Sequence, residues 1–312
     1  MKEKNKINWS KGDHKKAIIE QRKNLWKEDT LKMIADWLPL KPEMIMLDVG
    51  CGLGYNGFTY WKYFGKNGVY LGVDISEDLI KEAKTLAKEW ALGGKAEFKL
   101  GSVYKLPFKD NSADITICQT LLMHLKEPKK SLQEMKRVTK HGGLIVCVEP
   151  DNLSNSMRIG YSSLPELTTE QKILLHRVHF IVYEGHKKLG FGDYAIANKI
   201  PKMMSDLDLY EIDIICNDKC FFLIPPYETE EQQRIIEKIQ KNINKKDTKD
   251  YYLEGFKDKF FAGGGSKYLY YKYKRFIKEH NWKAQMKEQL SKKSFYRFGG
   301  ASFFYVIRGK KK

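Results

Sequence analysis

The spacing of apolar residues predicts short buried strands that alternate with amphipathic helices in the first half of the chain. Apolar runs at 44–48, 69–73, 96–100, 112–119 and 144–148 have the length of strands and end near Gly, Pro, Asp or Asn. Between most of these runs, apolar residues recur every three or four positions, as they do on one face of a helix. This alternation predicts an α/β fold with a doubly wound, parallel sheet.

In the second half of the chain, the pattern predicts mainly helices. Residues 167–190 predict one helix, capped by Thr168 or Thr169 and ended by Gly190. Residues 192–218 predict a helix followed by a strand, and 225–290 are charged and helical. A last apolar stretch at 295–308 predicts a final strand.

A glycine-rich stretch, LDVGCGLG at 47–54, follows the first predicted strand. Asp48 is followed by Gly50, Gly52 and Gly54 at alternate positions. Glycine permits a positive φ angle and lets a ligand approach the backbone, and the helix beyond it offers free N–H groups. The spacing differs from the Gly-x-Gly-x-x-Gly of dinucleotide sites. The acid favours a ligand with a cationic amine over a pyrophosphate, and a glycine turn without a ligand is the alternative.

A second acid, Asp74, ends the second predicted strand about twenty residues after the glycine loop, a spacing that places a carboxylate on ribose hydroxyls. Hydroxyl groups donate hydrogen bonds to carboxylates, so an acid suits this role. Polar residues also end the other predicted strands. Because the carboxyl ends of parallel strands form the ligand-binding edge, we expect one shared site that contains Asp48, Asp74, Ser102, Gln119 and Glu149.

The glycine loop, the spaced acid and the segment LPFKDNSADITICQTLLMHLKEP at 106–128 resemble the class I S-adenosylmethionine (SAM)-dependent methyltransferases. The resemblance is specific over 44–150 and weaker over 192–218 and 295–308. It implies a Rossmann-like, seven-stranded, mostly parallel sheet with strand 7 antiparallel and with helical insertions. It also implies SAM as cofactor and S-adenosylhomocysteine as product.

Cofactor contacts follow from this resemblance. Arg22 would reach the SAM carboxylate, and Gln119 would meet the methionine part. Many family members hold the adenine amino group with an Asp where Ser102 stands here, so its hydroxyl or the Val103 backbone would replace that Asp. The implied cofactor-binding residues are Arg22, Asp48, Gly50, Cys51, Gly52, Gly54, Asp74, Ile75, Ser102, Val103, Gln119 and Thr120.

The candidate catalytic residues are His124, Glu149 and Asp151. His124 would face the transferred methyl group or the adenine edge, and an imidazole pKa near neutrality suits a general base. Packing beside the cofactor is the alternative for this histidine. Glu149 and Asp151 could act as bases or orient the substrate. The candidate substrate-binding residues are Arg158, Tyr161, Tyr183 and Phe191.

We expect one domain built on the sheet, with an N-terminal cap and two helical insertions. A helical cap at 1–40 would cover either the cofactor pocket or only the sheet. The methyltransferase domain would comprise 41–224 and 291–312, with helical insertions at 151–191 and 225–290 that form a substrate lid.

The chain has 312 residues and a formal net charge of +17. Nucleic-acid binding would use such a charge, but a lysine-rich composition alone also produces it. More than half of the net positive charge lies in the last ninety or so residues, where tyrosines are mixed with lysines. Those tyrosines could stack on bases or pack a helix whose lysines stay in water.

We therefore expect a methyltransferase that modifies an N, O or S atom of a small-molecule acceptor. The alternative is a tRNA or rRNA methyltransferase that uses the basic C-terminal region. A SAM-binding module without catalysis is a third possibility, and the loop spacing disfavours a nicotinamide dehydrogenase. The chain would act as a monomer or homodimer.

No apolar run reaches the roughly 20 residues of a membrane span, and the N-terminal residues lack the apolar core of a signal peptide. We expect a cytoplasmic protein with no membrane contact. The five cysteines are scattered, which is no disulfide framework, and Cys216 and Cys220 lack two further zinc ligands nearby. We therefore expect no metal.

Overall fold

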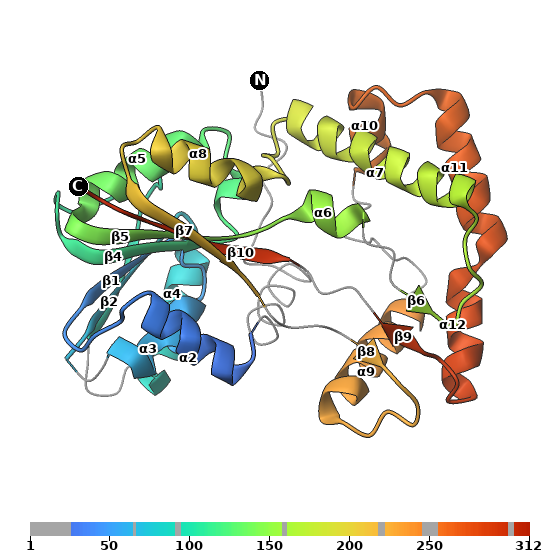
Figure 1. Cartoon of the computed structure of the whole chain (residues 1–312), viewed down its shortest axis with the longest axis horizontal. Coiled ribbons are helices and arrows are strands. Elements are labelled where there is room, and N and C mark those ends of the chain that lie inside the picture. Colours follow the sequence, from blue (N-terminus) through green and yellow to red (C-terminus); the bar gives the residue numbers. More distant parts are fainter. Residues whose placement is uncertain are drawn as a thin grey trace. The chain divides into compact units, whose positions relative to one another are not determined.

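The computed structural model describes residues 26–64, 67–90, 95–157, 161–217, 222–244, 255–298 and 303–312. The chain forms two compact units. The first unit comprises Met1–Asp151, Gly192–Lys219 and Phe303–Lys312, and the second comprises Asn152–Phe191 and Cys220–Ser302. Figure 1 shows the sheet of the first unit and the helices of the second. Within the described ranges, no helix is long and apolar enough to cross a membrane.

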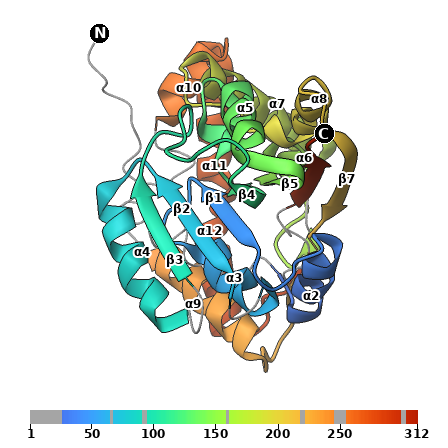
Figure 2. The ribbon, with the colours of Figure 1, turned by 90° about the vertical axis from the view of Figure 1, so that its left-hand side faces the viewer.

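The first unit contains a seven-stranded sheet with the order β3-β2-β1-β4-β5-β10-β7 (Figure 2). Strands β1 to β5 are parallel, whereas β10 runs antiparallel to both of its neighbours. The expected fold is confirmed, including the antiparallel last strand. The strands are β1 (Ile45–Val49), β2 (Val69–Asp74), β3 (Lys95–Leu100), β4 (Ala113–Gln119), β5 (Thr139–Pro150), β7 (Tyr210–Cys216) and β10 (Phe304–Lys310).

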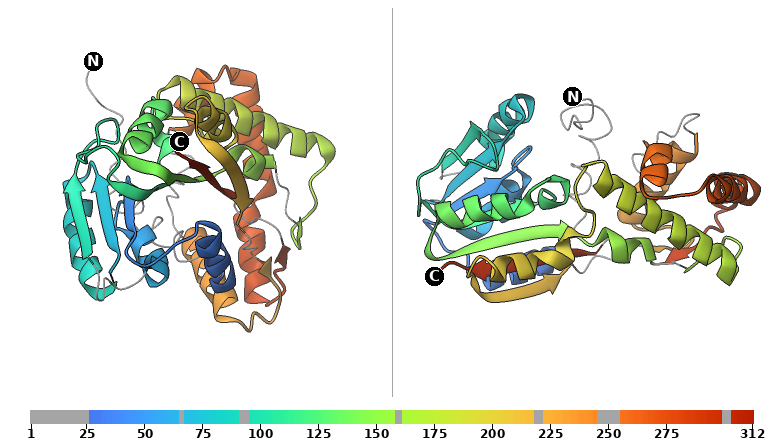
Figure 3. Two further views of the ribbon diagram at one scale, coloured as in Figure 1. Left: turned by 60° about the vertical axis from the view of Figure 1, so that its left-hand side comes forward. Right: turned by 90° about the horizontal axis from the view of Figure 1, so that it is seen from above.

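Helices cover both faces of this sheet (Figure 1; Figure 3). Helices α2, α3 and α4 pack on one face, and α5 and α8 lie on the other. The helical segments of the unit are α2 (Glu28–Trp37), α3 (Tyr55–Phe64), α4 (Glu77–Trp90), η1 (Leu122–His124), α5 (Pro128–Val138), η2 (Ile196–Lys199) and α8 (Ile200–Ser205).

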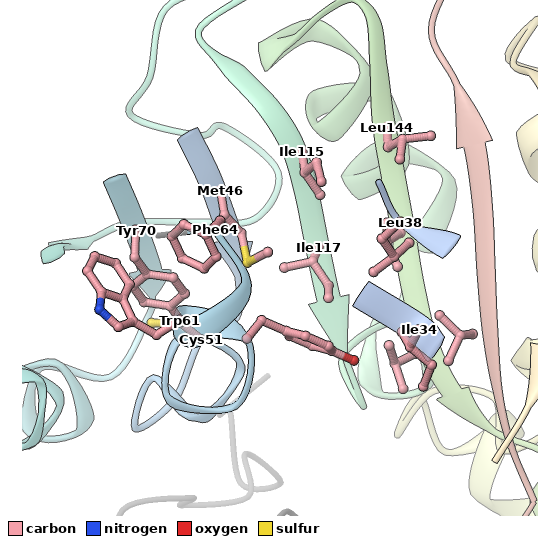
Figure 4. Packing of buried hydrophobic residues seen from close by; sticks show 14 of the residues in the cluster. Ile34, Leu38, Met46, Cys51, Trp61, Phe64, Tyr70, Ile115, Ile117 and Leu144 are labelled. Atoms are coloured by element: carbon pink, nitrogen blue, oxygen red, sulfur yellow. The ribbon is translucent and has the colours of Figure 1, made fainter. Parts of the chain in front are cut away.

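A large buried cluster lies between the sheet and α2, α3 and α4 (Figure 4). Alternate residues of the strands, such as Met46 and Ile117, point to this face and meet Phe64 of α3 and Ile34 of α2. Because the side chains of a strand alternate between the two faces of the sheet, each buried strand contributes apolar residues to the core on both faces.

The second unit contains helices and a small sheet with the order β6-β9-β8. One buried cluster joins α7, α10 and α11, and another joins the small sheet to α9 and α12. The elements are α6 (Asn152–Met157), β6 (Tyr161–Ser162), α7 (Thr169–Lys188), β8 (Phe222–Leu223), α9 (Glu230–Asn244), α10 (Phe256–Ala262), α11 (Lys267–His280), α12 (Trp282–Ser291) and β9 (Arg297–Phe298).

Helix α7 begins as its sequence predicts. The Thr168 hydroxyl accepts a hydrogen bond from the Gln171 backbone at 3.3 Å, and the Gln171 side chain accepts one from the Thr168 backbone at 2.8 Å. This reciprocal pair satisfies two N–H groups that the helix itself cannot. The expected cap at Thr168 is confirmed.

Three expected boundaries are wrong. The stretch 295–308 is not one strand, because its ends belong to β9 in the second unit and β10 in the first. The apolar pattern gives no sign that the two ends join different sheets. Strand β5 begins at Thr139, so its twelve residues include the glycines expected before it. The sequence pattern predicts a helix from Ser131 to Thr139, but α5 begins at Pro128, where proline needs no N–H partner.

We predict that Gly185→Ala destabilises the protein by at least about 2 kcal/mol, because the added methyl group overpacks the contact between α7 and α10. A Cβ at this position would lie 1.6 Å from the Lys259 carbonyl oxygen. Urea unfolding followed by circular dichroism measures the loss. Glu184→Ala, at the exposed neighbouring position, is the control and should change stability little. Equal stability of the two variants would contradict the close packing.

Candidate functional site

The glycine loop joins β1 to α3 at the carboxyl edge of the sheet. Gly50, Gly52 and Gly54 have φ angles of 72°, 52° and 80°. Only glycine adopts this left-handed conformation at little cost. The backbone N–H groups of Gly50 and Cys51 donate to the Val73 carbonyl at 2.8 and 3.0 Å, so the loop is tied to the end of β2.

The carboxylate of Asp74 holds the same loop from the next strand. Its Oδ2 accepts from the Gly52 N–H and its Oδ1 from the Ser76 N–H, both at 2.9 Å. Burial raises the pKa of Asp74, and these backbone hydrogen bonds oppose the rise. The side chain is still partly exposed. Because a carboxylate has about four acceptor positions, ligand hydroxyl groups could also bind it.

Asp48 lies deeper, with 1% of its surface exposed. Its Oδ1 accepts from the Asn56 side-chain amide at 3.1 Å and its Oδ2 from the Tyr70 hydroxyl at 2.6 Å. These bonds connect β1, α3 and β2, and they satisfy a carboxylate that would otherwise be costly to bury. Its expected role beside a cationic amine stays a prediction.

Glu149 holds the segment that leaves β4. It is fully buried, and its Oε1 accepts from the N–H groups of Leu121 and Leu122 at 2.8 and 2.7 Å. Thr120, just before them, has a φ of 48°. The Leu121 side chain lies against Gly50, where an added Cβ would approach it to 2.7 Å. Glu149 thus fixes a segment that packs on the glycine loop, a contact that the sequence analysis missed.

His124 ends the short helix η1. Burial lowers the pKa of its imidazole to about 4. The expectation of a pKa near neutrality is therefore wrong, since desolvation disfavours the charged ring. The segment after α7 packs beside it: the Asp193 N–H donates to the Met123 carbonyl at 2.9 Å, and Gly192 allows this close approach.

The remaining polar candidates close turns or end strands. The Ser102 hydroxyl accepts from the Tyr104 N–H at 3.2 Å and so closes the turn after β3. Gln119 ends β4 and is 6% exposed. Asp151 is 1% exposed, and its backbone N–H donates to the Phe303 carbonyl at 2.9 Å.

Apolar side chains are exposed after β2, at the end of β3 and in the turn that follows β3. Ile75 is 72% exposed, Leu100 is 55% exposed, and Tyr104 is 39% exposed. Leu100 pairs in register with Asp74 at the ends of β3 and β2. The sequence analysis named Ile75 but missed the other two. The signal was present in Ala96, Phe98 and Leu100, whose alternation continues to the exposed end of β3.

The structure thus brings most candidates to the carboxyl edge of the first unit. Two arginines, Arg22 and Arg158, lie outside the described residues. Tyr161, Tyr183 and Phe191 belong to the second unit. The Tyr183 ring stacks on His179 and the Phe191 ring on His186, with centroids 6.5 and 5.3 Å apart, whereas Tyr161 lies in the small sheet.

Comparison with known proteins assigns the part of the chain that contains this edge to a family. Residues 40–187 match the family model described as a methyltransferase domain. Residues 40–187 form a methyltransferase domain. Strands β1 to β5 lie in this range, and β7 and the antiparallel β10, from outside it, complete the sheet order of a class I SAM-dependent methyltransferase.

Two curated relatives share this methyltransferase domain. An uncharacterised methyltransferase of Schizosaccharomyces pombe is 44% identical over 114 residues, or 35% of this chain and 41% of the relative. Demethylmenaquinone methyltransferase of Oceanobacillus iheyensis is 31% identical over 154 residues, or 49% of this chain and 61% of the relative. The chain thus matches less than two thirds of the length of these relatives.

Among solved structures, the YcgJ protein of Bacillus subtilis is similar to this chain with a TM-score of 0.49 and 17% sequence identity. The alignment covers 92% of this chain and 99% of the solved one.

We predict that the buried imidazole of His124 makes stability fall in acid. Between the pKa of about 4 in the folded state and about 6.5 in the unfolded state, the unfolded chain binds more protons. This destabilisation is negligible at pH 7.5 and reaches about 2.5 kcal/mol at pH 4.5.

The measurement is urea unfolding of wild type and His124→Gln at pH 7.5 and 4.5. The variant should lose less stability in acid than wild type, while His141→Gln, at an exposed histidine, should follow wild type. Parallel losses in wild type and His124→Gln would show that this imidazole is not desolvated.

Proposed function

We propose that the protein is a SAM-dependent methyltransferase that modifies an N, O or S atom of a small-molecule acceptor. The observation that carries this proposal is the contact between Asp74 and the Gly52 N–H at 2.9 Å, at the carboxyl edge of a class I methyltransferase sheet. A Cβ built on Gly52 meets no atom of the described residues within 4 Å. The loop therefore has open space on the side where a ligand can contact its backbone.

The residues at this edge fit the parts of SAM. Asp74 has acceptor positions for the ribose hydroxyls, and exposed Ile75, Leu100 and Tyr104 provide apolar surface for adenine. The glycine loop would lie under the methionine part. The predicted contact of Arg22 with the carboxylate of SAM remains part of this proposal.

Bound SAM supplies an electrophilic methyl group on a sulfonium, and S-adenosylhomocysteine remains after transfer. The protein must hold the acceptor atom in line, about 3 Å from the methyl carbon, and exclude water. His124, neutral at pH 7, could accept a proton from the acceptor or orient it. We assign Glu149 a positioning role, since its Oε1 already holds the turn. Asp151 remains a candidate for orienting the acceptor.

A small-molecule acceptor is supported by relatives named demethylmenaquinone methyltransferase. The substrate-lid role of the second unit, with Arg158, Tyr161, Tyr183 and Phe191, belongs to the same proposal. One observation favours RNA as the alternative acceptor: Tyr268 and Tyr271 of α11 are 77% and 68% exposed among lysines. RNA binding would weaken steeply with salt. A screen of acceptors with labelled SAM, run at low and moderate salt, separates the two substrates.

We predict that Asp74→Asn weakens binding of S-adenosylhomocysteine by about 1.5–3 kcal/mol, the range for a hydrogen bond to a charged group. The amide keeps one acceptor but loses the charge that attracts the ribose hydroxyls. Isothermal titration calorimetry measures the change. Glu89→Gln, at an exposed acid on α4, should bind like wild type. An unchanged Kd in Asp74→Asn would refute the ribose assignment.

We also predict different effects of two glycine substitutions with the same backbone strain. Gly52 and Gly142 both have positive φ angles, and a Cβ at either meets no described atom within 4 Å. Each change to Ala should cost about 1 kcal/mol of stability. Only Gly52→Ala should weaken S-adenosylhomocysteine binding, by at least tenfold, because its methyl group enters the ligand space. If both variants keep full affinity in calorimetry, the ligand does not lie over Gly52.

A further inference from the structure

Helix α11 carries more positive charge than its acids balance. It contains four lysines and one arginine but a single acid, Glu279, which pairs with Arg275 at 3.4 Å. The four lysines are exposed, and none forms an ion pair with a carboxylate of the described residues. They are Lys267, Lys272, Lys274 and Lys278. A solvated helix face usually balances its charges with opposite charges four residues apart, and α11 lacks this balance.

Two tyrosines are exposed among these cations. Tyr268 is 77% exposed and Tyr271 is 68% exposed. With about 3.6 residues per turn, both fall within the same arc of about 160° as the cations, with lysines on either side of them. We name this arc the basic tyrosine face. It comprises Lys267, Tyr268, Tyr271, Lys272, Lys274, Arg275 and Lys278.

The opposite side of α11 is core, which holds the basic tyrosine face in place. Leu269, Tyr273 and Phe276 are buried with residues of α7 and α10. Tyr270 packs against the same cluster, and its ring meets that of Tyr271 edge to face, with centroids 5.4 Å apart and planes at 82°. This contact restricts the Tyr271 ring, so it is partly ordered before any partner binds.

Charge and composition together identify the partner. An unbalanced row of cations attracts a polyanion and repels a second copy of the same helix. A helix that lies on a membrane buries its apolar side in lipid, whereas the apolar side of α11 already belongs to the core. Surfaces that bind single-stranded nucleic acid combine cations along the strand with aromatic rings on which bases stack. The basic tyrosine face has both features.

The dimensions of the basic tyrosine face also suit a single strand. Side chains three residues apart on a helix have Cβ atoms about 5–6 Å apart, so neighbouring bases can each meet one of the two tyrosines. From Lys267 to Lys278 the helix rises about 16 Å, which is the length of about five stacked nucleotides at about 3.4 Å each.

We propose that the basic tyrosine face binds a single-stranded nucleic acid, with bases stacked on Tyr268 and Tyr271 and phosphates paired with the lysines. The proposal concerns binding and does not rest on the proposed function. A strand held here is a partner of the protein, whichever acceptor is methylated.

Fluorescence anisotropy of labelled decauridylate with the full chain, at about 50 mM salt, tests the stacking. Tyr268→Ser and Tyr271→Ser should each weaken binding at least about fivefold, because each loses one stacked base. The matched control is Tyr161→Ser, at a tyrosine of β6 that is 71% exposed, and it should bind like wild type. An abasic strand of the same length, which keeps the phosphates, should bind wild type and the α11 variants alike.

Salt dependence tests the phosphate contacts. Lys272→Gln combined with Lys274→Gln should lower the slope of log Kd against log salt concentration by about 1.4, because each phosphate contact on a single strand contributes about 0.7. The control combines Lys241→Gln with Lys287→Gln, which removes the same charge at exposed positions of α9 and α12. It should keep the wild-type slope.

Several results would overturn the proposal. They are equal decauridylate binding by wild type and the α11 tyrosine variants, equal affinity of wild type for decauridylate and the abasic strand, or equal slopes in the two lysine variants. Loss of binding to phosphatidylglycerol vesicles in Tyr268→Ser, with decauridylate binding unchanged, would identify an anionic membrane as the partner instead. Calorimetry with S-adenosylhomocysteine separates the two proposals: normal binding of that ligand without decauridylate binding refutes the basic tyrosine face alone.

Discussion

Carboxylates that accept hydrogen bonds from loop N–H groups organise the edge on which the whole site depends. Asp74 binds the Gly52 N–H, and Glu149 binds those of Leu121 and Leu122. A loop at the end of a strand leaves its N–H groups without sheet partners, and leaving them unsatisfied would be costly. Each acid therefore holds the loop that follows a strand in one conformation. The Leu121 side chain on Gly50 then joins the two fastened segments into one surface.

Sequence reasoning reached this edge because its signals are local. Strand length, the glycine spacing and an acid about twenty residues later all lie within single βα units. These signals predicted the parallel sheet and placed Asp48, Asp74, Gln119 and Glu149 at strand ends, and the resemblance to class I methyltransferases implied its seven strands. The sequence pattern could not predict which group each polar side chain binds, because that depends on contacts between strands far apart in sequence.

His124 and the stretch 295–308 show two different limits. The histidine follows an apolar segment, and Gly192 and Asp193, far along the chain, pack beside it. Burial lowers the pKa of its ring to about 4. The apolar alternation of 295–308 does predict strand residues. It contains no information on which sheet they join, so β9 and β10 could not be separated from the pattern.

Three acids lie at the ends of β1, β2 and β5 in one sheet, yet their surroundings give them different roles. Asp48 and Glu149 are buried, and each carries internal hydrogen bonds that hold helices, strands or turns together. Asp74 makes similar bonds but remains partly exposed beside Ile75 and Leu100. A buried carboxylate that accepts hydrogen bonds from the protein fixes local geometry, whereas one that is partly exposed can also exchange water for ligand hydroxyls. Exposure, rather than residue type, therefore makes Asp74 the acid that can recognise a ligand.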